Sequence, residues 1–252
     1  MSDLTERERE RYRRQMILPG WGESAQQKLK SCTVFVVGAG GLGSAAILYL
    51  AAAGVGCIRV CDRERVELSN LNRQVLYSTR RLGALKVISI RRAVKRFNPH
   101  VRVVSLAATL TEENVGELSA GAGVLLDCLD NIPARMALNR HAVKTGIPLV
   151  HAGVQGFGGQ LTFIHHPSTA CLACFLTDEP TRAMPLPVLG TTAGTLGCLQ
   201  ALEAIKHVTG LGACARNRIV FWDGESLGFE EVKIVKNPDC PVCGSVSTRH
   251  AT

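Results

Sequence analysis

A glycine-rich segment in the first fifth of the chain has the residue types and spacing needed to hold a phosphate. Gly38-x-Gly40-x-x-Gly43 follows the apolar run Thr33–Val37 and precedes a helix-compatible run, Ser44–Ala53. Glycines at this spacing allow a tight turn, a close approach of the backbone to a phosphate, and close packing of helix on strand. The free N–H groups and the positive dipole end of the new helix then face the anion. The segment therefore predicts a nucleotide site.

Further residues follow the next strands at positions where they could complete such a site. Asp62 ends a second short strand, Cys57–Cys61, about 20 residues past the loop, where an acid that binds ribose is expected. Lys86 lies near the start of a later helix, and Asp130 follows the strand Val124–Cys128, at the carboxyl edge where α/β sheets bind ligands. The candidate site also includes Gly41, Ser69, Asn70, Leu71, Asn72, Arg73 and Asn131.

The cations in this set distinguish two kinds of nucleotide chemistry. An NAD-linked oxidoreductase holds its pyrophosphate with the glycine loop and the helix end, and extra cations are optional. A triphosphate that releases pyrophosphate needs cations for the departing charge and a carboxylate for Mg²⁺. Arg73 and Lys86 can supply the cations, and Asp130 can hold the metal ion. Each alone is typical of an ordinary surface charge; together they favour the triphosphate, with the oxidoreductase as the alternative.

Four of the ten cysteines form two pairs with metal-ligand spacing. Cys171 and Cys174 form the first Cys-x-x-Cys pair, and Cys240 and Cys243 form the second. Together they can supply the four thiolates of a tetrahedral zinc site, which would be structural because it leaves no open position for water. The alternative is a redox dithiol, which normally lies at a strand-to-helix junction. For most of the other six cysteines we expect buried, reduced thiols.

These motifs require a sheet that brings strand ends together. Strand and helix candidates alternate through the first 150 residues, which predicts a doubly wound, mostly parallel, Rossmann-like α/β sheet with right-handed crossovers. The expected parallel strands are Thr33–Val37, Cys57–Cys61, Val101–Ser105, Val124–Cys128 and Pro148–Ala152, with a basic amphipathic helix over Gly83–Phe97.

After residue 155 the pattern changes to antiparallel strands. The candidates are Gln160–Ile164, Arg218–Trp222 and Phe229–Val235, with a helix over Thr192–Val208 between them. We interpret residues 1–252 as one domain. Residues 1–155 form its nucleotide-binding half, and residues 156–252 form a substrate-handling half that carries the cysteine pairs.

Composition excludes several classes of function. The net charge is +8, but aromatic residues make up only 5%, and no nucleic-acid recognition motif is present, so we expect no nucleic-acid partner. No apolar run reaches the ~20 residues of a membrane helix. The charged amino terminus, Asp3–Glu10, lacks the apolar core of a signal peptide. We therefore expect a soluble, cytoplasmic protein without a membrane partner.

These motifs together resemble the HesA/MoeB/ThiF family, the prokaryotic relatives of ubiquitin-activating enzymes. The resemblance runs from Arg11 to Cys243 and includes the glycine loop, the segment 69–74, Asp130-Asn131 and both cysteine pairs. Within the family it is strongest to the enzymes that adenylate the sulfur carriers of molybdopterin and thiamine synthesis.

The resemblance implies an adenylyltransferase that uses ATP and Mg²⁺, with a structural Zn²⁺. Its partner would be a small ubiquitin-fold sulfur carrier ending in Gly-Gly, whose carboxylate becomes an acyl-adenylate as pyrophosphate leaves. By position, Gly41 would lie at the phosphates, Asp62 at the ribose, Asn70 and Arg73 at the nucleotide, Lys86 at a phosphate and Asp130 at the magnesium. Arg14 resembles an arginine that reaches the neighbouring subunit's ATP site, which implies a homodimer.

One departure from the family pattern bears on the sulfur step. Several relatives carry a cysteine in the loop after the first cysteine pair, but residues 177–187 contain none, and Cys198 lies in an apolar helix. We therefore predict adenylation without an essential enzyme-bound sulfur step and with a separate sulfur-donor protein. The residues also leave open a non-catalytic binding scaffold and an enzyme that activates a different carboxylate.

Overall fold

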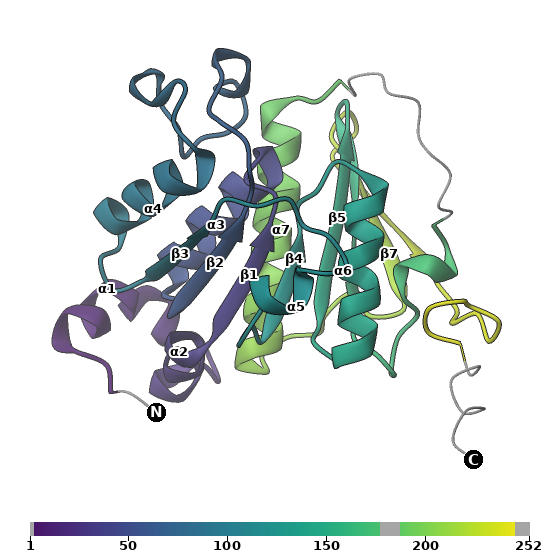
Figure 1. Cartoon of the computed structure of the whole chain (residues 1–252). Coiled ribbons are helices and arrows are strands. Elements are labelled where there is room, and N and C mark those ends of the chain that lie inside the picture. Colours follow the sequence, from purple (N-terminus) through teal and green to yellow (C-terminus); the bar gives the residue numbers. More distant parts are fainter. Residues whose placement is uncertain (1–2, 177–186, 245–252) are drawn as a thin grey trace.

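A single twisted sheet of eight strands forms the middle layer of the described part of the chain, residues 3–176 and 187–244 of the computed structural model (Figure 1). The strand order is β3-β2-β1-β4-β5-β6-β7-β8. The strands are β1 (Thr33–Val37), β2 (Cys57–Cys61), β3 (Arg102–Leu106), β4 (Val124–Asp127), β5 (Leu149–Gln155), β6 (Gly158–Ile164), β7 (Arg218–Asp223) and β8 (Gly228–Lys233).

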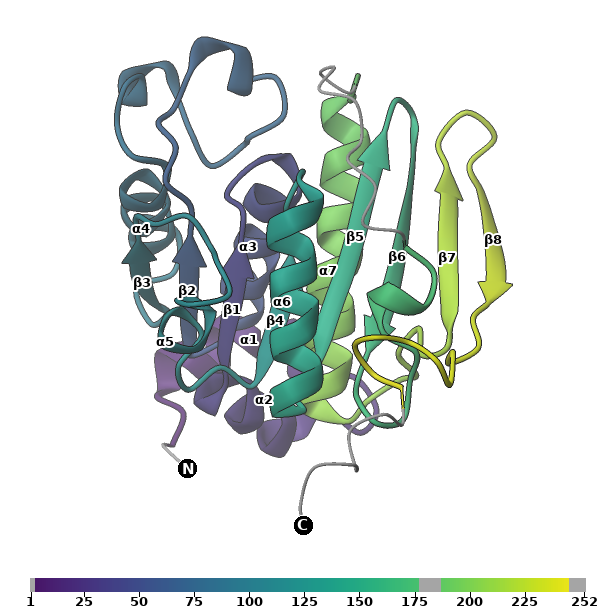
Figure 2. The ribbon, with the colours of Figure 1, turned by 45° about the vertical axis from the view of Figure 1, so that its right-hand side comes forward.

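The first five strands are parallel and the last three antiparallel. β1 pairs with β2 and β4, β2 with β3, and β4 with β5, all in parallel register, whereas β5 to β8 pair in antiparallel register. Because the parallel strands point the same way, the loops after β1, β2 and β4 meet at one edge, the upper edge in Figure 2. The predicted fold class, a mostly parallel doubly wound sheet continued by antiparallel strands, is confirmed.

Helices cover both faces of the sheet (Figure 2). α3, α4 and α7 share one apolar core with α2, and α5 and α6 share the other with the cysteine segments. The helices are α1 (Glu6–Met16), α2 (Gly22–Ser31), α3 (Gly41–Ala53), α4 (Lys86–Phe97), α5 (Val115–Leu118), α6 (Ile132–Thr145) and α7 (Gly190–Thr209), and the short 3₁₀ helices are η1 (Leu68–Asn70), η2 (Thr79–Arg81) and η3 (Leu172–Cys174).

Element boundaries differ from the predicted ones by a few residues, for local reasons. α4 begins at Lys86 because Gly83 has φ +77°, in the left-handed region, which a right-handed helix cannot include. β5 continues to Gln155 because the antiparallel partner β6 pairs with it up to Gly158. α3 begins three residues before the predicted Ser44, directly after the turn. Within the described residues, no helix has both the length and the apolar character that crossing a membrane requires.

Candidate functional site

The turn between β1 and α3 forms the floor of the candidate nucleotide site. Gly38 has φ +93°, and a Cβ there would lie 2.3 Å from the carbonyl oxygen of Cys128. A Cβ on Gly43 would lie 2.0 Å from the carbonyl oxygen of Gly38. Close packing on backbone atoms therefore requires glycine at these two positions. They fix the path of the turn and place the amino terminus of α3 at the upper edge of the sheet.

The two middle glycines have different surroundings. Beside Gly40, the nearest atom to a Cβ would be Nε2 of Gln74 at 3.9 Å, so packing among the described residues leaves this position open. Gly40 is also the N-cap of α3 and has no side chain that could accept from the first-turn N–H groups. A Cβ on Gly41, in contrast, would meet Ala193 Cβ at 2.8 Å and Arg73 Cγ at 3.5 Å. Gly40 thus leaves room for a ligand, whereas Gly41 is constrained by α7.

Asp62 ties the end of β2 to the glycine loop. One of its carboxylate oxygens accepts from the Ala39 N–H at 2.8 Å, and the other accepts from the Glu64 N–H at 2.7 Å. Each oxygen keeps a further lone pair for a ligand hydroxyl. This geometry fits the ribose position that the sequence predicts for Asp62.

The segment that follows lies against the loop and carries Arg73. The Tyr77 hydroxyl donates to the Ala39 carbonyl at 2.7 Å, and the buried Asn70 accepts from the Glu67 N–H at 3.1 Å. The Arg73 guanidinium donates to the Ser69 carbonyl at 2.9 Å and to Asn72 Oδ1 at 3.0 Å. Arg73 therefore lies beside the first turn of α3, and the predicted Ser69 and Asn72 orient it. Leu71 is partly buried and packs against the apolar core.

Lys86 is a buried cation at the amino terminus of α4. Its side chain is only 3% exposed, and its Nζ lies 2.5 Å from Oε2 of Glu64, whose side chain is 63% exposed. The Lys86 N–H also donates to the Glu64 carbonyl at 2.9 Å. A buried ammonium whose partner faces solvent can exchange that partner for a phosphate. Glu64 was not among the residues predicted from the sequence, although its place two residues after Asp62 was a usable signal.

Asp130 and Asn131 follow β4 but have separate roles. Asn131 Oδ1 accepts from the Ala134 N–H at 3.0 Å and caps α6, so the structure gives this predicted nucleotide contact a helix-capping role. Asp130 is exposed, and within the described residues its carboxylate has no hydrogen bond or ion pair. A free carboxylate at the phosphate edge suits Mg²⁺, which binds through one or two carboxylates and substrate phosphates.

A buried charge cluster beneath Asp130 was missed by the sequence analysis. Asp127 Oδ2 lies 2.9 Å from Arg135 Nε and 2.7 Å from His151 Nδ1, and all three side chains are largely buried. Burial raises the pKa of Asp127, but the charge of Arg135 and the hydrogen bond from His151 outweigh it and lower the pKa. Burial lowers the pKa of His151 and favours its neutral form. The only sequence signal was an aspartate inside the otherwise apolar run Val124–Cys128.

Arg14 lies far from the nucleotide site of its own chain. Tyr12 of α1 accepts from Asn98 at 2.9 Å, and Gln15 donates to the Ala53 carbonyl at 2.8 Å. Asn98 and Ala53 are at the carboxyl ends of α4 and α3, and the 13 residues of α3 span about 20 Å. The structure therefore brings the other predicted site residues to one edge of the sheet and places α1 at the opposite edge.

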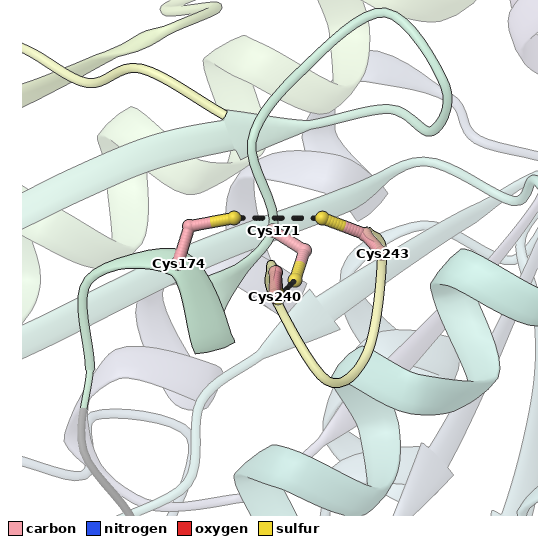
Figure 3. A group of neighbouring side chains, drawn as sticks. All are labelled: Cys171, Cys174, Cys240 and Cys243. Carbon is pink, nitrogen blue, oxygen red and sulfur yellow. Dashed lines mark hydrogen bonds between the residues drawn. The ribbon is translucent and has the colours of Figure 1, made fainter. Parts of the chain in front are cut away.

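The two cysteine pairs converge on one cluster (Figure 3). The four sulfur atoms all lie within 4.8 Å of one another, with Cys171 and Cys240 3.7 Å apart and Cys174 and Cys243 3.4 Å apart. Tetrahedral zinc with Zn–S bonds of about 2.3 Å separates its sulfurs by about 3.8 Å, so the cluster fits this ion. The short contacts join one pair to the other, which favours a metal centre over a dithiol within either pair.

The cluster joins segments that are 69 residues apart in the chain. Cys171 precedes η3, and Cys240 follows β8, and both are buried against α6 and β5 in the second core. Burial tends to raise the pKa of Cys240, but N–H groups of Cys243 and Val242 and the neighbouring thiols lower it to about 7. Zinc bound here would supply a structural crosslink between the end of the sheet and η3.

Removal of metal by a chelator is expected to lower Tm by about 10 °C, since structural zinc contributes several kcal/mol and each kcal/mol shifts Tm of a chain this long by roughly 2–4 °C. Differential scanning fluorimetry, with metal content measured on the same samples, checks this. A Cys214→Ser variant, which alters a thiol outside the cluster, is the matched control: it should keep its metal and show the same fall in Tm on chelation as the wild-type protein. An unchanged Tm after complete metal removal contradicts a structural metal.

The chain is similar to known proteins over nearly its whole length. The ThiF family profile matches residues 12–242. A sulfur carrier protein adenylyltransferase of Thermus thermophilus is 39% identical over 97% of this chain and 94% of its own length. The molybdopterin-synthase adenylyltransferase of Escherichia coli is 38% identical over 97% of this chain and 100% of its own.

The fold comparison agrees. The crystal structure of E. coli MccB with ATP superposes with a TM-score of 0.83 at 21% identity, over 93% of this chain and 73% of the other. At that identity the likeness shows the shared fold. The family resemblance and the adenylyltransferase class, both predicted from the sequence, are confirmed by the profile and by the named relatives. The chain therefore belongs to the ThiF family.

Proposed function

We propose that this chain adenylates the C-terminal Gly-Gly carboxylate of a small ubiquitin-fold sulfur carrier in molybdopterin or thiamine synthesis. A carboxylate oxygen of the terminal glycine attacks the α-phosphorus of ATP. The bond from this phosphorus to the oxygen bridging to the β-phosphate breaks, and pyrophosphate leaves. The relatives named as adenylyltransferases of a sulfur carrier and of molybdopterin synthase support this substrate class.

One observation carries the proposal: two cations and an uncommitted carboxylate surround the glycine loop. Arg73 lies against Gly41, Lys86 is buried behind the Asp62 turn, and Asp130 follows the neighbouring strand. A dinucleotide needs none of these, whereas departing pyrophosphate needs the positive charge. Mg²⁺ held by Asp130 would neutralise further charge on the phosphates. The Asp62 carboxylate would orient the ribose, and Lys86 would exchange Glu64 for a phosphate.

The antiparallel end of the sheet offers a surface for the carrier. Phe221 on β7 and Val232 on β8 are 37% and 44% exposed. Ile219 lies opposite Val232 in the ladder, which extends the exposed apolar face across β7 and β8. Exposed apolar residues that gather on one sheet are typical of protein interfaces. We infer that residues 156–252 provide the carrier-binding half of the domain.

Cys198 and Cys214, two partly buried cysteines outside the metal cluster, give no support to a covalent sulfur step on this chain. Burial raises the pKa of Cys198 on α7 and that of Cys214. Because the thiolate is the reactive form, a raised pKa makes both poor nucleophiles at neutral pH. The loop without a cysteine, residues 177–187, falls largely outside the described residues. We infer that a separate protein donates the sulfur.

Carrier-dependent ATP–pyrophosphate exchange tests the proposed function. Gly-Gly carriers from the molybdopterin, thiamine and other sulfur pathways are each added to the purified protein with MgATP. We expect exchange with at least one carrier and none with the same carrier lacking its last glycine. If none of the Gly-Gly carriers supports exchange, the proposal is contradicted and activation of another carboxylate is favoured. Bound nicotinamide together with a lack of exchange would favour an oxidoreductase.

A further inference from the structure

We propose that Arg135 is a positioning residue that fixes the loop presenting Asp130, through its buried ion pair with Asp127. The inference rests on the role proposed above for Asp130 toward Mg²⁺. Arg135 lies in the first turn of α6, directly below the loop that connects β4 to this helix. No hydrogen bond or ion pair joins Arg135 to the Asp130 side chain among the described residues, so Arg135 would act on the loop backbone.

Both peptide groups of Leu129, the residue before Asp130, are held by this pair. The Leu129 N–H donates to Asp127 Oδ1 at 3.1 Å. The Leu129 carbonyl accepts from Arg135 Nη2 at 2.6 Å. Arg135 Nε meanwhile lies 2.9 Å from the other carboxylate oxygen of Asp127. The two side chains therefore close a ring of contacts around a single loop residue.

The residue after Asp130 is held by the same helix turn. Asn131 accepts the Ala134 N–H through its side chain at 3.0 Å, and its carbonyl accepts the Arg135 N–H at 3.3 Å. Asp130 is thus the exposed residue between two anchored neighbours. A metal ligand gains affinity when its direction is fixed before binding, and groups that orient ligands typically contribute 10–100-fold.

The burial of the cluster argues for positioning over stability. The side chain of Asp127 is 0% exposed and that of Arg135 is 11% exposed, and His151 supports Asp127 from β5. On the other face of the sheet, Gln200 of α7 donates to the Asp127 carbonyl at 2.8 Å. A buried ion pair of this kind often stabilises a fold no better than apolar residues of the same volume. Its contacts to Leu129 give it a role that apolar residues could not take.

Three variants separate positioning from folding. Arg135→Gln removes the positive charge and the contacts of Arg135 with the Asp127 carboxylate and the Leu129 carbonyl. The double variant Asp127→Asn/Arg135→Gln removes both charges, so that no unpaired ion is left buried. Arg140→Gln is the matched control, because Arg140 lies on the same helix and pairs with the exposed Glu112. For each protein, hydrogen–deuterium exchange of the peptide covering residues 128–131 is measured without ligands. The Mg²⁺ concentration for half-maximal ATP–pyrophosphate exchange is measured alongside.

We expect hydrogen–deuterium exchange in the 128–131 peptide to become about tenfold faster in both Arg135 variants. The Mg²⁺ concentration for half-maximal ATP–pyrophosphate exchange should rise by about tenfold or more. The control should change neither, and the KM for the carrier should stay constant. Variants that match the control in both measurements overturn the proposal. So does a loss of protection that spreads evenly over α6 and β4, which indicates a role in overall stability. If the wild-type protein lacks adenylation activity, the proposed function fails, and the deuterium measurement still decides whether Arg135 fixes the loop.

Discussion

Asp130→Asn is expected to lower the rate of carrier-dependent ATP–pyrophosphate exchange by about a thousandfold while leaving Tm unchanged. The Asp130 carboxylate is exposed, so its replacement leaves no buried group without a partner. The amide keeps the size of the side chain but loses the charge that would hold Mg²⁺ against the departing phosphates. The loss should therefore fall on kcat and on the Mg²⁺ requirement, with little change in the KM for the carrier.

Glu117→Gln provides the charge-matched control for this variant. Glu117 is an exposed carboxylate on α5, near the amino end of β4, and its neutralisation should leave the exchange rate unchanged. An Asp130→Asn variant that keeps more than about a tenth of the exchange rate would exclude Asp130 as a principal metal ligand.

The glycine loop could be predicted from the sequence because its requirements are local and steric. Gly38 and Gly43 lie within five residues of each other, and each excludes a Cβ by contact with nearby backbone. The cysteine pairs were predictable for a related reason, since each pair is a local turn with fixed ligand spacing. That the two pairs meet depends on the tertiary fold, but it could be expected because a structural zinc ion needs four ligands and each pair supplies two.

The buried polar contacts could not be predicted in the same way. The partners of Asp127 come from β5 and α6, and nothing in the local pattern shows which cation will lie beside a carboxylate. Asn131 illustrates the same limit, because it was predicted to contact the nucleotide from its place next to Asp130. In the structure its position before Ile132 makes it the N-cap of a helix. The residue types limited which chemistry these side chains could perform, but their neighbours in the folded structure determine which role each side chain takes.

A mixed dimer is expected to show that Arg14 acts in trans. α1 packs at the carboxyl end of α3, and the 13 residues of α3 separate that end from the glycine loop by about 20 Å, which is well beyond the reach of an arginine side chain. Ile17 and Leu18, just after α1, are 69% and 51% exposed, and Val75 near the nucleotide site is 64% exposed. We propose a two-fold symmetric homodimer that covers these apolar residues and brings Arg14 to the partner's ATP. Arg14→Ala alone should then lower ATP–pyrophosphate exchange by about a hundredfold.

Co-expression with two affinity tags yields the heterodimers that test this arrangement. Pairing an Arg14→Ala chain with an Asp130→Asn chain leaves one site with both native residues, so about half of the wild-type rate should return. Pairing a wild-type chain with an Arg14→Ala/Asp130→Asn chain leaves each site lacking one of the two residues, and this dimer should be nearly inactive. If Arg14 acted within its own chain, the two results would be exchanged. A monomer in solution at assay concentration would contradict the shared site directly.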